Sequence, residues 1–453
     1  MAQLATIVDE YEAKGEVLLV DAGDRITGNA FVDDAPQPGV PMVELMNYIG
    51  YDVVTFGNHE FDYGYSALCA MLDKAEFCVV CSNVYPYEDM PNYMPEALFL
   101  KEVDGVKIGF AGVVSTDSDG RPSGSDEALA PYYFTPDIEI AEQMSGAVNG
   151  EFDYAILLSH MGLKMDRNLA ERTSNYDWIV GGHSHDFVCE RVGDVQITQN
   201  GSNLYAVTIA DIEIQDGEIL NITFSQEVID DEPAKKEVID MVADIKRLSP
   251  ELNVVEGSVS KLVTKDGVAN FTVDALETYP YADGFVPEIS IYHYGGIRLT
   301  NILPGDISRG DIYNNDPFKS TIVVGEMTTE QLRTMILDKY NNGTVKDYDK
   351  ESHYNYFRMN IPYTILVGDT PAEMPDAIDV ILPTLEAGRT YRVAMANYIA
   401  QKYIDKAIVQ SQLRSTDILV RTAMLEHLHT FTDGYIPDNK VYQIEVPASQ
   451  YKR

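Results

Sequence analysis

The chain is organised around Val53-Val-Thr-Phe-Gly-Asn-His-Glu-Phe-Asp-Tyr-Gly64. An apolar run ends at a glycine, and Asn58, His59, Glu60 and Asp62 follow within a few positions. Such a run is typical of a buried strand in a parallel sheet. Because ligands of open α/β sheets gather just past the carboxyl ends of such strands, the polar residues indicate a metal or catalytic site. For this stretch alone, the alternative is a polar turn with one solvated histidine.

Three further apolar runs end in the same way. Val17-Leu-Leu-Val20 leads into Asp21-Ala-Gly-Asp24, Ala155-Ile-Leu-Leu-Ser159 into His160, and Trp178-Ile-Val-Gly-Gly182 into His183-Ser-His185. Together with the first stretch, these motifs contain half of the 8 histidines in the chain. Carboxylate oxygens and imidazole nitrogens are ligands of divalent metal ions. The repetition therefore predicts a metal centre on the rim of one sheet.

The five predicted metal ligands differ in role. Asp24 follows a glycine in a tight turn and is the natural carboxylate to bridge two ions. Asn58 offers a carbonyl oxygen, and His160 and His183 supply imidazoles to the same ion. His185, two residues further along, is predicted to bind the neighbouring ion.

A general acid is also predicted. His59 directly follows a ligand and therefore points elsewhere, which suits an acid beside the leaving group of a substrate. Asp62 is predicted to orient that imidazole and to stabilise its charge. Two ions and an acidic histidine together describe the hydrolysis of a phosphate ester.

Length and composition limit the number of domains and the kinds of partner. A chain of 453 residues is expected to form two domains. Its net charge of −39 argues against nucleic acid and anionic membranes as partners. No apolar run is long enough for a membrane span. Cys78-x-x-Cys81 lies inside a strand pattern, which favours core thiols over a zinc or redox motif.

The order of elements predicts the domain boundaries. Strands and helices alternate over residues 1–230, with two hairpins added, which is typical of an α/β catalytic domain. A charged linker helix is predicted within residues 231–252. Residues 253–453 are predicted to form a second α/β domain, with one of its helices at Ser415–His427.

The four motifs resemble, in order and spacing, those of the calcineurin-like metallophosphoesterases. The similarity is to the group of 5′-nucleotidases, UDP-sugar hydrolases and 2′,3′-cyclic-nucleotide phosphodiesterases. It implies a four-layered α/β sandwich followed by an α/β domain that binds the substrate. It also implies two divalent ions, zinc, manganese or similar, held by the ligands named above, and His59 with Asp62 as the catalytic pair.

One departure from the family concerns the start of the chain. The family opens with an Asp-x-His motif that supplies two ligands of the first metal, and none of the 23 residues before Asp24 forms it. Asp9 lies in the helix expected to follow that motif and is no substitute. We expect the natural start to lie further upstream, and the alternative is a one-metal or inactive relative. No signal peptide is recognised at Met1, although the resemblance implies an exported protein.

The second domain resembles the nucleotide-binding domain of the same family. His293-Tyr-Gly-Gly-Ile-Arg298 is similar to its Asn-x-Gly-Gly-Ile-Arg loop, which implies that Arg298 contacts the substrate and that His293 replaces asparagine. Phe318 matches an aromatic residue that sandwiches a nucleobase. Tyr398 matches the second half of that sandwich, but Lys402-Tyr-Ile404 replaces the Gly-Gly-Asp that contacts the nucleoside.

The sequence thus predicts a metal-dependent hydrolase, with a nucleoside 5′-monophosphate or a related nucleotide as substrate. One alternative keeps the reaction and changes the substrate to a sugar nucleotide, a cyclic phosphodiester or a non-nucleotide ester. Another alternative is a non-catalytic relative that binds a ligand.

Overall fold

The computed structural model describes residues 1–87, 95–117, 120–148, 150, 152–230, 232–342, 356–369, 376–409 and 413–451. Two units divide the chain. The first consists of Met1–Thr27 and Phe31–Ser249, and the second of Gly28–Ala30 and Pro250–Arg453. Across the described ranges, no helix combines the length and the apolar character needed to cross a bilayer.

The first unit is built on two main sheets. The smaller is parallel, in the order β1-β2-β3, and consists of β1 (Leu19–Asp21), β2 (Tyr51–Val54) and β3 (Cys78–Val79). The larger has the order β10-β11-β9-β8-β6-β5. Its strands are β5 (Leu98–Val103), β6 (Val106–Val114), β8 (Tyr154–His160), β9 (Trp178–Gly181), β10 (Phe187–Val192) and β11 (Val195–Asn200). Its four inner strands are parallel, and the two edge strands are antiparallel to their neighbours.

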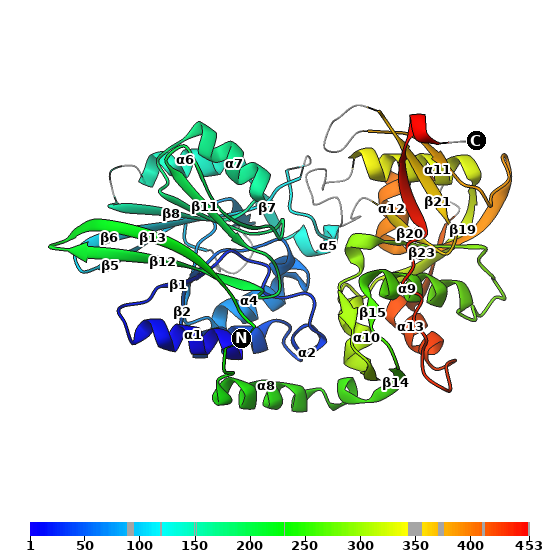
Figure 1. Ribbon diagram of the computed structural model, residues 1–453, viewed down its shortest axis with the longest axis horizontal. Coiled ribbons are helices and arrows are strands. Elements are labelled where there is room, and N and C mark those ends of the chain that lie inside the picture. Colours follow the sequence, from blue (N-terminus) through cyan, green and yellow to red (C-terminus); the bar gives the residue numbers. More distant parts are fainter. Residues whose placement is uncertain are drawn as a thin grey trace. The chain divides into compact units, whose positions relative to one another are not determined.

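Two smaller sheets and the helices complete this half of the chain (Figure 1). The small sheets pair β4 (Val84–Pro86) with β7 (Tyr132–Phe134), and β12 (Ala206–Gln215) with β13 (Glu218–Val228). The helices are α1 (Ala2–Glu12), α2 (Ala30–Asp33), α3 (Val40–Ile49), α4 (Gly64–Lys74), α5 (Asp126–Leu129), α6 (Asp137–Val148), α7 (Leu163–Arg172), α8 (Lys236–Leu248) and the short η1 (His59–Phe61).

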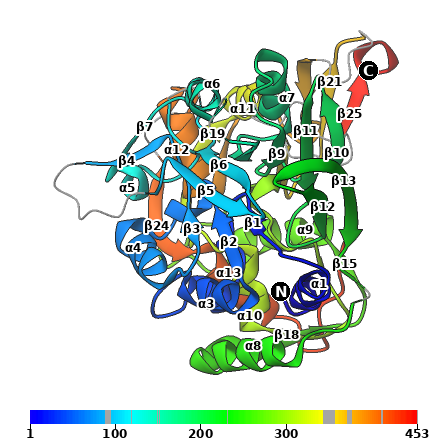
Figure 2. The ribbon, with the colours of Figure 1, turned by 90° about the vertical axis from the view of Figure 1, so that its left-hand side faces the viewer.

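Side-chain alternation along the strands creates the layers of the first unit. Val54 packs in a core with α1, α3 and α4, whereas its neighbour Val53 packs in the core between the two sheets. Likewise Leu157 faces α6 and α7, and Leu158 faces the inter-sheet core. Successive strand residues point to opposite faces, so each sheet buries both sides. The result is the order helix, sheet, sheet, helix (Figure 2), and the predicted four-layered α/β sandwich is confirmed.

The second unit also mixes strands and helices. Its largest sheet has the order β20-β16-β23-β19-β24, and a three-stranded sheet has the order β22-β21-β25. The strands of these sheets are β16 (Ile289–His293), β19 (Thr321–Thr328), β20 (Phe357–Met359), β21 (Tyr363–Val367), β22 (Ala377–Ile381), β23 (Thr390–Ala396), β24 (Arg414–Leu419) and β25 (Gln443–Pro447). Two pairs join β14 (Val255–Val259) to β18 (Gly305–Ser308) and β15 (Val263–Thr264) to β17 (Asn301–Ile302).

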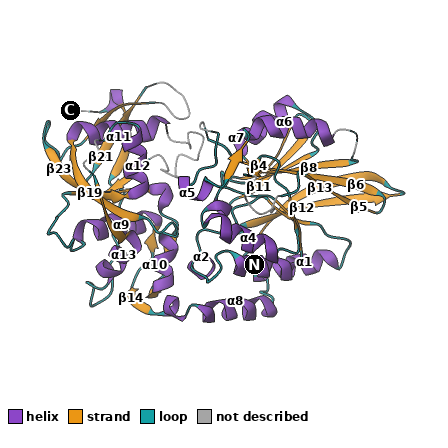
Figure 3. Ribbon diagram, turned by 180° about the vertical axis from the view of Figure 1, so that it is seen from behind, coloured by secondary structure: helices purple, strands orange, loops and turns teal. Residues whose placement is uncertain are grey.

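Helices cover the sheets of the second unit (Figure 3). They are α9 (Lys265–Thr278), α10 (Arg309–Asn315), α11 (Thr329–Asn342), α12 (Asn397–Asp405), α13 (Val420–Leu428) and the short η2 (Pro250–Asn253), η3 (Tyr294–Gly296) and η4 (Ala448–Gln450). Helix α9 packs on β16 and α13, and α11 packs on β19 and β22. One continuous apolar core joins these elements.

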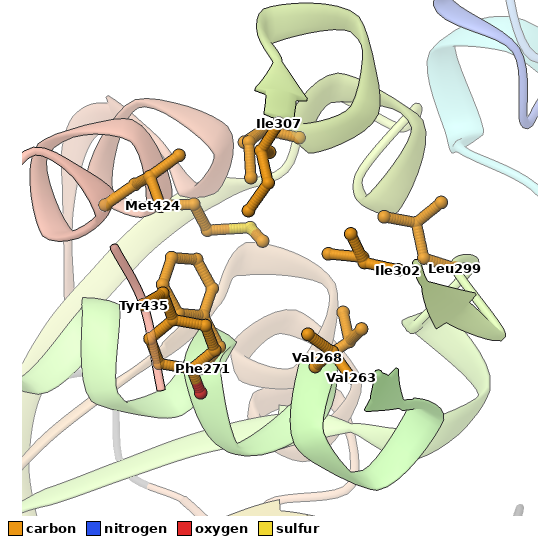
Figure 4. Close-up of a pocket in the computed structure, with 10 residues that line it drawn as sticks. Val263, Val268, Phe271, Leu299, Ile302, Ile307, Met424 and Tyr435 are labelled. Atoms are coloured by element: carbon orange, nitrogen blue, oxygen red, sulfur yellow. The ribbon is translucent and has the colours of Figure 1, made fainter. Parts of the chain in front are cut away.

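A small pocket lies in that core (Figure 4). It is lined by Val263, Val268, Phe271, Leu299, Ile302, Ile307, Ile312, Met424, Leu428 and Tyr435. None of the predicted substrate residues lines it. With an almost wholly apolar lining, it is a packing space of the core and offers no group that would orient a polar ligand.

One helix predicted from the sequence begins later than expected. The range Ser415–His427 was expected to be helical, but its first residues belong to β24 and α13 begins at Val420. Strand β24 pairs with β19, so an edge position on the sheet outweighs local helix propensity.

Candidate functional site

The predicted ligands of the first unit follow strands of two different sheets. Asp24 and Asn58 come after β1 and β2 of the small sheet, and His160 and His183 come at or after the ends of β8 and β9 of the large sheet. The expectation of a site on the rim of one sheet is therefore wrong in this respect. Stacking the two sheets brings the carboxyl ends of both sets of strands to one edge.

Three of these side chains form a group that could hold a metal ion. One ligand atom each from Asp24, His160 and His183 lies within 4.8 Å of the others. His160 Nδ1 lies 2.5 Å from the carbonyl oxygen of Ala22, to which it donates. That bond leaves Nε2 directed at Asp24 Oδ2, 2.9 Å away.

The His160–Asp24 contact fits a shared ion. Nε2 of His160 is buried and has no partner in hydrogen-bond geometry among the described residues. Two ligand atoms that each bind a metal at about 2.1 Å lie roughly 3 Å apart when their bonds are at right angles. An imidazole nitrogen and a carboxylate oxygen are also the donor types that zinc, manganese and iron accept.

Electrostatics keeps Asp24 ionised and His183 neutral, the protonation states in which these two residues bind a cation. Burial acts to raise the pKa of Asp24, but His160 and His59 outweigh it and hold that pKa well below its ordinary value. Burial and the nearby His160 lower the pKa of His183 to about 3. Burial would lower the pKa of His160, but Asp24 reverses the effect and raises it. A raised pKa favours a proton on His160, facing the Asp24 carboxylate. A metal ion bound in place of that proton would neutralise the same carboxylate.

Asn58 faces the group of Asp24, His160 and His183, whereas His185 lies outside it. The side-chain amide of Asn58 is buried and donates to the carbonyl oxygen of Ser123 at 3.3 Å. Its Oδ1 lies 3.1 Å from His183 Nδ1, so the carbonyl oxygen faces the group. His185 lies outside the group of three, although its charge acts on His183. Its role as a ligand stays a prediction.

The predicted catalytic pair is in contact. His59 Nδ1 lies 2.7 Å from Asp62 Oδ2, and the hydroxyl of Thr27 donates to the same oxygen at 2.8 Å. With Nδ1 bonded to the carboxylate, Nε2 is the nitrogen that could transfer a proton to a substrate. The backbone N–H of His59 donates to Asp24 Oδ1 at 2.9 Å. The pair is thereby tied to the metal-binding group.

Glu60 holds together the turn at Asp24 and the turn at Gly57, a role that the sequence pattern did not predict. Its buried carboxylate accepts hydrogen bonds from the backbone N–H groups of Asp24 (2.9 Å), Arg25 (2.9 Å) and Gly57 (2.5 Å). An ionised acceptor of several backbone donors fixes their geometry. The signal available in the sequence was an acid next to the general acid in the central motif.

Gly57 allows the two turns to touch. A Cβ on Gly57 would lie 2.1 Å from Asp24 Oδ1 and 2.6 Å from its backbone nitrogen. We expect Gly57→Ala to displace the Asp24 carboxylate and to lower the rate of the predicted phosphate-ester hydrolysis about 100-fold, since misplacement by about 1 Å has that effect. Steady-state kinetics measures this. Gly146→Ala is the control, because a Cβ there meets nothing within 4 Å, and equal activity of the two variants would contradict the expectation.

A buried acid lies behind the histidine strands. Asp166 of α7 accepts a hydrogen bond from Ser159 Oγ at 2.5 Å, beside His160. Its second oxygen has no partner within the described part of the chain and would lie 2.5 Å from a Cβ on Gly181. Burial raises the pKa of Asp166 to about 7. A single acidic residue in a helical pattern does not indicate from the sequence that its side chain is buried beside the metal-binding group.

Removing that acid is expected to change how stability depends on pH. The folded pKa lies above the unfolded value of about 3.9, so the stability that the bound proton contributes is complete below pH 4 and is lost as pH rises through 7. In metal-free protein, the free energy of unfolding of Asp166→Asn should therefore exceed that of the wild type by an amount that grows from pH 5 to pH 8. The difference should reach at most about 4 kcal/mol.

Urea unfolding at pH 5, 6.5 and 8 measures this difference. Asp211→Asn, at an exposed site on β12, is the control and should show a difference that does not vary with pH. A constant difference for Asp166→Asn would contradict the expectation.

The predicted substrate residues of the second unit form two contacting pairs. The Arg298 guanidinium carbon lies 5.8 Å from the centroid of the Phe318 ring, and the ring is partly exposed. The rings of His293 and Tyr398 lie 5.4 Å apart and are tilted by 41°. Both aromatic residues leave surface for a ligand, with 38% of Phe318 and 48% of Tyr398 exposed.

Comparison with protein families divides the chain in the same order. Residues 1–187 match the calcineurin-like phosphoesterases, and residues 249–405 match the 5′-nucleotidase C-terminal domain. The first match contains all seven predicted metal and catalytic residues. The second contains Arg298, Phe318, Tyr398 and His293.

Individual relatives are similar to most of the chain. The trifunctional nucleotide phosphoesterase YfkN of Bacillus subtilis is 27% identical over 440 residues, which cover 84% of this chain and 29% of that protein. The chain thus spans less than a third of this relative. A 5′-nucleotidase of Vibrio parahaemolyticus is 26% identical, with 79% and 73% of the two chains covered.

A solved structure shows the same fold. The 5′-nucleotidase precursor from Thermus thermophilus superimposes with a TM-score of 0.82 at 19% identity, covering 98% of this chain and 93% of that one. At this identity the likeness concerns the fold of the chain alone.

Proposed function

Since the chain belongs to the calcineurin-like phosphoesterases that carry a 5′-nucleotidase C-terminal domain, we propose that it is a metal-dependent hydrolase of phosphate esters. The observation that carries the proposal is the approach of Asp24, His160 and His183 within 4.8 Å, tied by a hydrogen bond from the His59 backbone to a histidine–aspartate pair. A cation site and a proton donor side by side are what this reaction needs.

The residues divide the chemistry between them. Asp24, Asn58, His160 and His183 would hold one divalent ion, and His185 is proposed for a second. A bound ion would supply Lewis-acid chemistry, lowering the pKa of a water molecule and polarising phosphoryl oxygens. The identity and the number of the ions stay predictions.

His59 is proposed to protonate the leaving group. Because Asp62 accepts a hydrogen bond from Nδ1 of His59, the proton that can be transferred is the one on Nε2. The Thr27 hydroxyl donates to the same Asp62 carboxylate and keeps it in place. Orientation by a carboxylate also stabilises the imidazolium before the proton is transferred. The hydrogen bond of the His59 backbone to Asp24 fixes the distance between the acid and the metal-binding group.

The proposed substrate is a nucleoside 5′-monophosphate or a related nucleotide. Arg298 suits an anionic group of the ligand because its guanidinium is always charged and donates in a fork. Phe318 and Tyr398 offer exposed aromatic faces, and His293 lies against Tyr398. The loss of Gly-Gly-Asp at Lys402-Tyr-Ile404 favours, as the second candidate, another phosphate ester as substrate. Export stays a prediction of the resemblance.

A panel of phosphate esters tests the reaction. The chain, reconstituted with zinc or manganese, should hydrolyse at least one nucleoside monophosphate, sugar nucleotide, cyclic nucleotide or simple phosphate ester. The product is inorganic phosphate from a monoester and a nucleoside monophosphate from a sugar nucleotide or a cyclic nucleotide. Activity should disappear with a chelator and return with the metal. A protein that binds the metal yet hydrolyses no member of the panel would favour the non-catalytic alternative.

A further inference from the structure

Four basic side chains from four separate elements act electrostatically on one imidazole in the second unit. Lys402 Nζ lies 6.0 Å from the centroid of the Tyr398 ring, and Lys265 Nζ lies 4.8 Å from the centroid of the ring of Tyr294, the residue after His293. Lys339 lies on α11, Lys402 on α12, Lys265 begins α9 and Arg298 follows η3. Burial first, and then each of these four cations, lowers the pKa of His293 to about 3, so its ring is neutral. The concentration of positive charge is unusual in a chain whose net charge is −39.

The His293 ring is packed between two aromatic rings and a glycine. It stacks on Tyr292 with centroids 5.1 Å apart and lies 5.4 Å from the ring of Tyr398. A Cβ on Gly296 would lie 2.3 Å from its Cε1, so only glycine fits beneath it. Its buried Nδ1 has no hydrogen-bond partner within the described ranges. A polar atom buried without a partner is costly unless a ligand or water satisfies it.

Neighbouring carboxylates are engaged elsewhere. Asp266 pairs with Arg358, and Asp338 pairs with Lys406 at 2.5 Å. Arg298 and Lys339 form no ion pair with any residue that the structure describes, and burial lowers the pKa of Lys339 to about 8. Partly buried positive charges without counter-ions attract an anion more strongly than exposed ones, because water screens them less.

One sequence departure falls within this group. Lys402 stands at the first glycine of the Gly-Gly-Asp segment expected from the family resemblance. A neutral position is thus cationic in this chain. The change adds one of the positive charges that act on His293 and makes its surroundings more suited to an anion.

We propose that Lys265, Arg298, Lys339 and Lys402 around His293 form a binding site for a phosphate-type dianion, here named the lysine site. Resting on the proposed function, the dianion is a second phosphate group of the substrate, so the preferred substrates are esters with two phosphates. The guanidinium donates in a fork and the ammonium groups donate as point charges. The neutral imidazole adds one N–H donor.

Binding of inorganic pyrophosphate tests the site without hydrolysis. Calorimetry on the full chain in a chelator, which removes divalent ions, should detect pyrophosphate binding that weakens as sodium chloride is raised. Lys339→Gln and Lys402→Gln, on two different helices, should each weaken binding about tenfold, the loss expected for one charge-assisted hydrogen bond. Lys261→Gln, at an exposed site outside the group, is the control and should bind like the wild type.

Circular dichroism and thermal unfolding check that each variant is folded. Pyrophosphate affinities of folded Lys339→Gln and Lys402→Gln that equal the wild-type value would overturn the proposal. So would the absence of salt-dependent binding by the wild type, which needs no variant.

Kinetics on a matched substrate pair tests the substrate class. For the metal-loaded protein, the KM for adenosine 3′,5′-bisphosphate should be about tenfold below that for adenosine 5′-monophosphate, and Lys339→Gln should abolish this difference. If both esters are hydrolysed with equal KM, the substrate part is overturned while the proposed function stands. If pyrophosphate binds through the two lysines but no ester is hydrolysed, the lysine site stands and the proposed function fails.

Discussion

Asp24→Asn is expected to lower the rate of phosphate-ester hydrolysis by about 10³-fold and to reduce the metal content of the protein. One oxygen of Asp24 accepts from the His59 backbone at 2.9 Å and the other faces His160 Nε2 at 2.9 Å. An asparagine keeps the shape but loses the charge that offsets a dication, and its NH₂ group presents a donor where an acceptor is needed. A loss of several kcal/mol of electrostatic stabilisation corresponds to that factor in rate.

Metal analysis of the purified protein and initial rates at saturating metal measure the two effects. Asp211→Asn, which removes one exposed carboxylate from β12, is the matched control and should keep both. If Asp24→Asn keeps wild-type activity, Asp24 is not part of the catalytic site.

His59→Ala is expected to lower kcat by about 10²- to 10⁴-fold on esters with an alcohol leaving group, the range typical of a lost general acid. The effect should shrink to less than about tenfold on p-nitrophenyl phosphate, because a phenolate of low pKa leaves without a proton. Asp62→Asn should give the same pattern with a smaller loss, since it removes the 2.7 Å contact that orients the ring.

The comparison of leaving groups separates catalysis from structure. A positional defect in the metal-binding group would reduce both reactions equally, and metal content should stay unchanged in His59→Ala. Equal losses on both substrates would therefore assign His59 a structural role.

Local patterns predicted the elements that carry the site. Strand β8 is buried along its whole length, and the apolar run before His160 indicated this. The hairpins with Asp-Gly at their turns also formed, as β5–β6 and β12–β13. Helix α13 was placed too early because the pairing of β24 with β19 is a long-range contact, and periodicity within a segment does not report it.

Single charged residues were harder to interpret than motifs. Glu60, which bonds three backbone N–H groups of two turns, stood in the central motif without an assigned role. Asp166 and Lys339 each lie in helices where an isolated charge is usually solvated. Their burial depends on what packs against the helix, which sequence spacing within that helix does not contain.

By itself, the sequence determined the donor types of the site and their places at strand ends, because strand periodicity and ligand chemistry are local properties of a few residues. Four motifs in a fixed order also indicated the resemblance to the calcineurin-like phosphoesterases. The tertiary structure decided that the donors converge from two sheets, with the Ala22 carbonyl bonded to His160 across 138 positions of the chain. It also decided that four cations from separate elements act on His293. Convergence of this kind depends on how layers stack and helices dock, and those contacts join residues far apart in the chain.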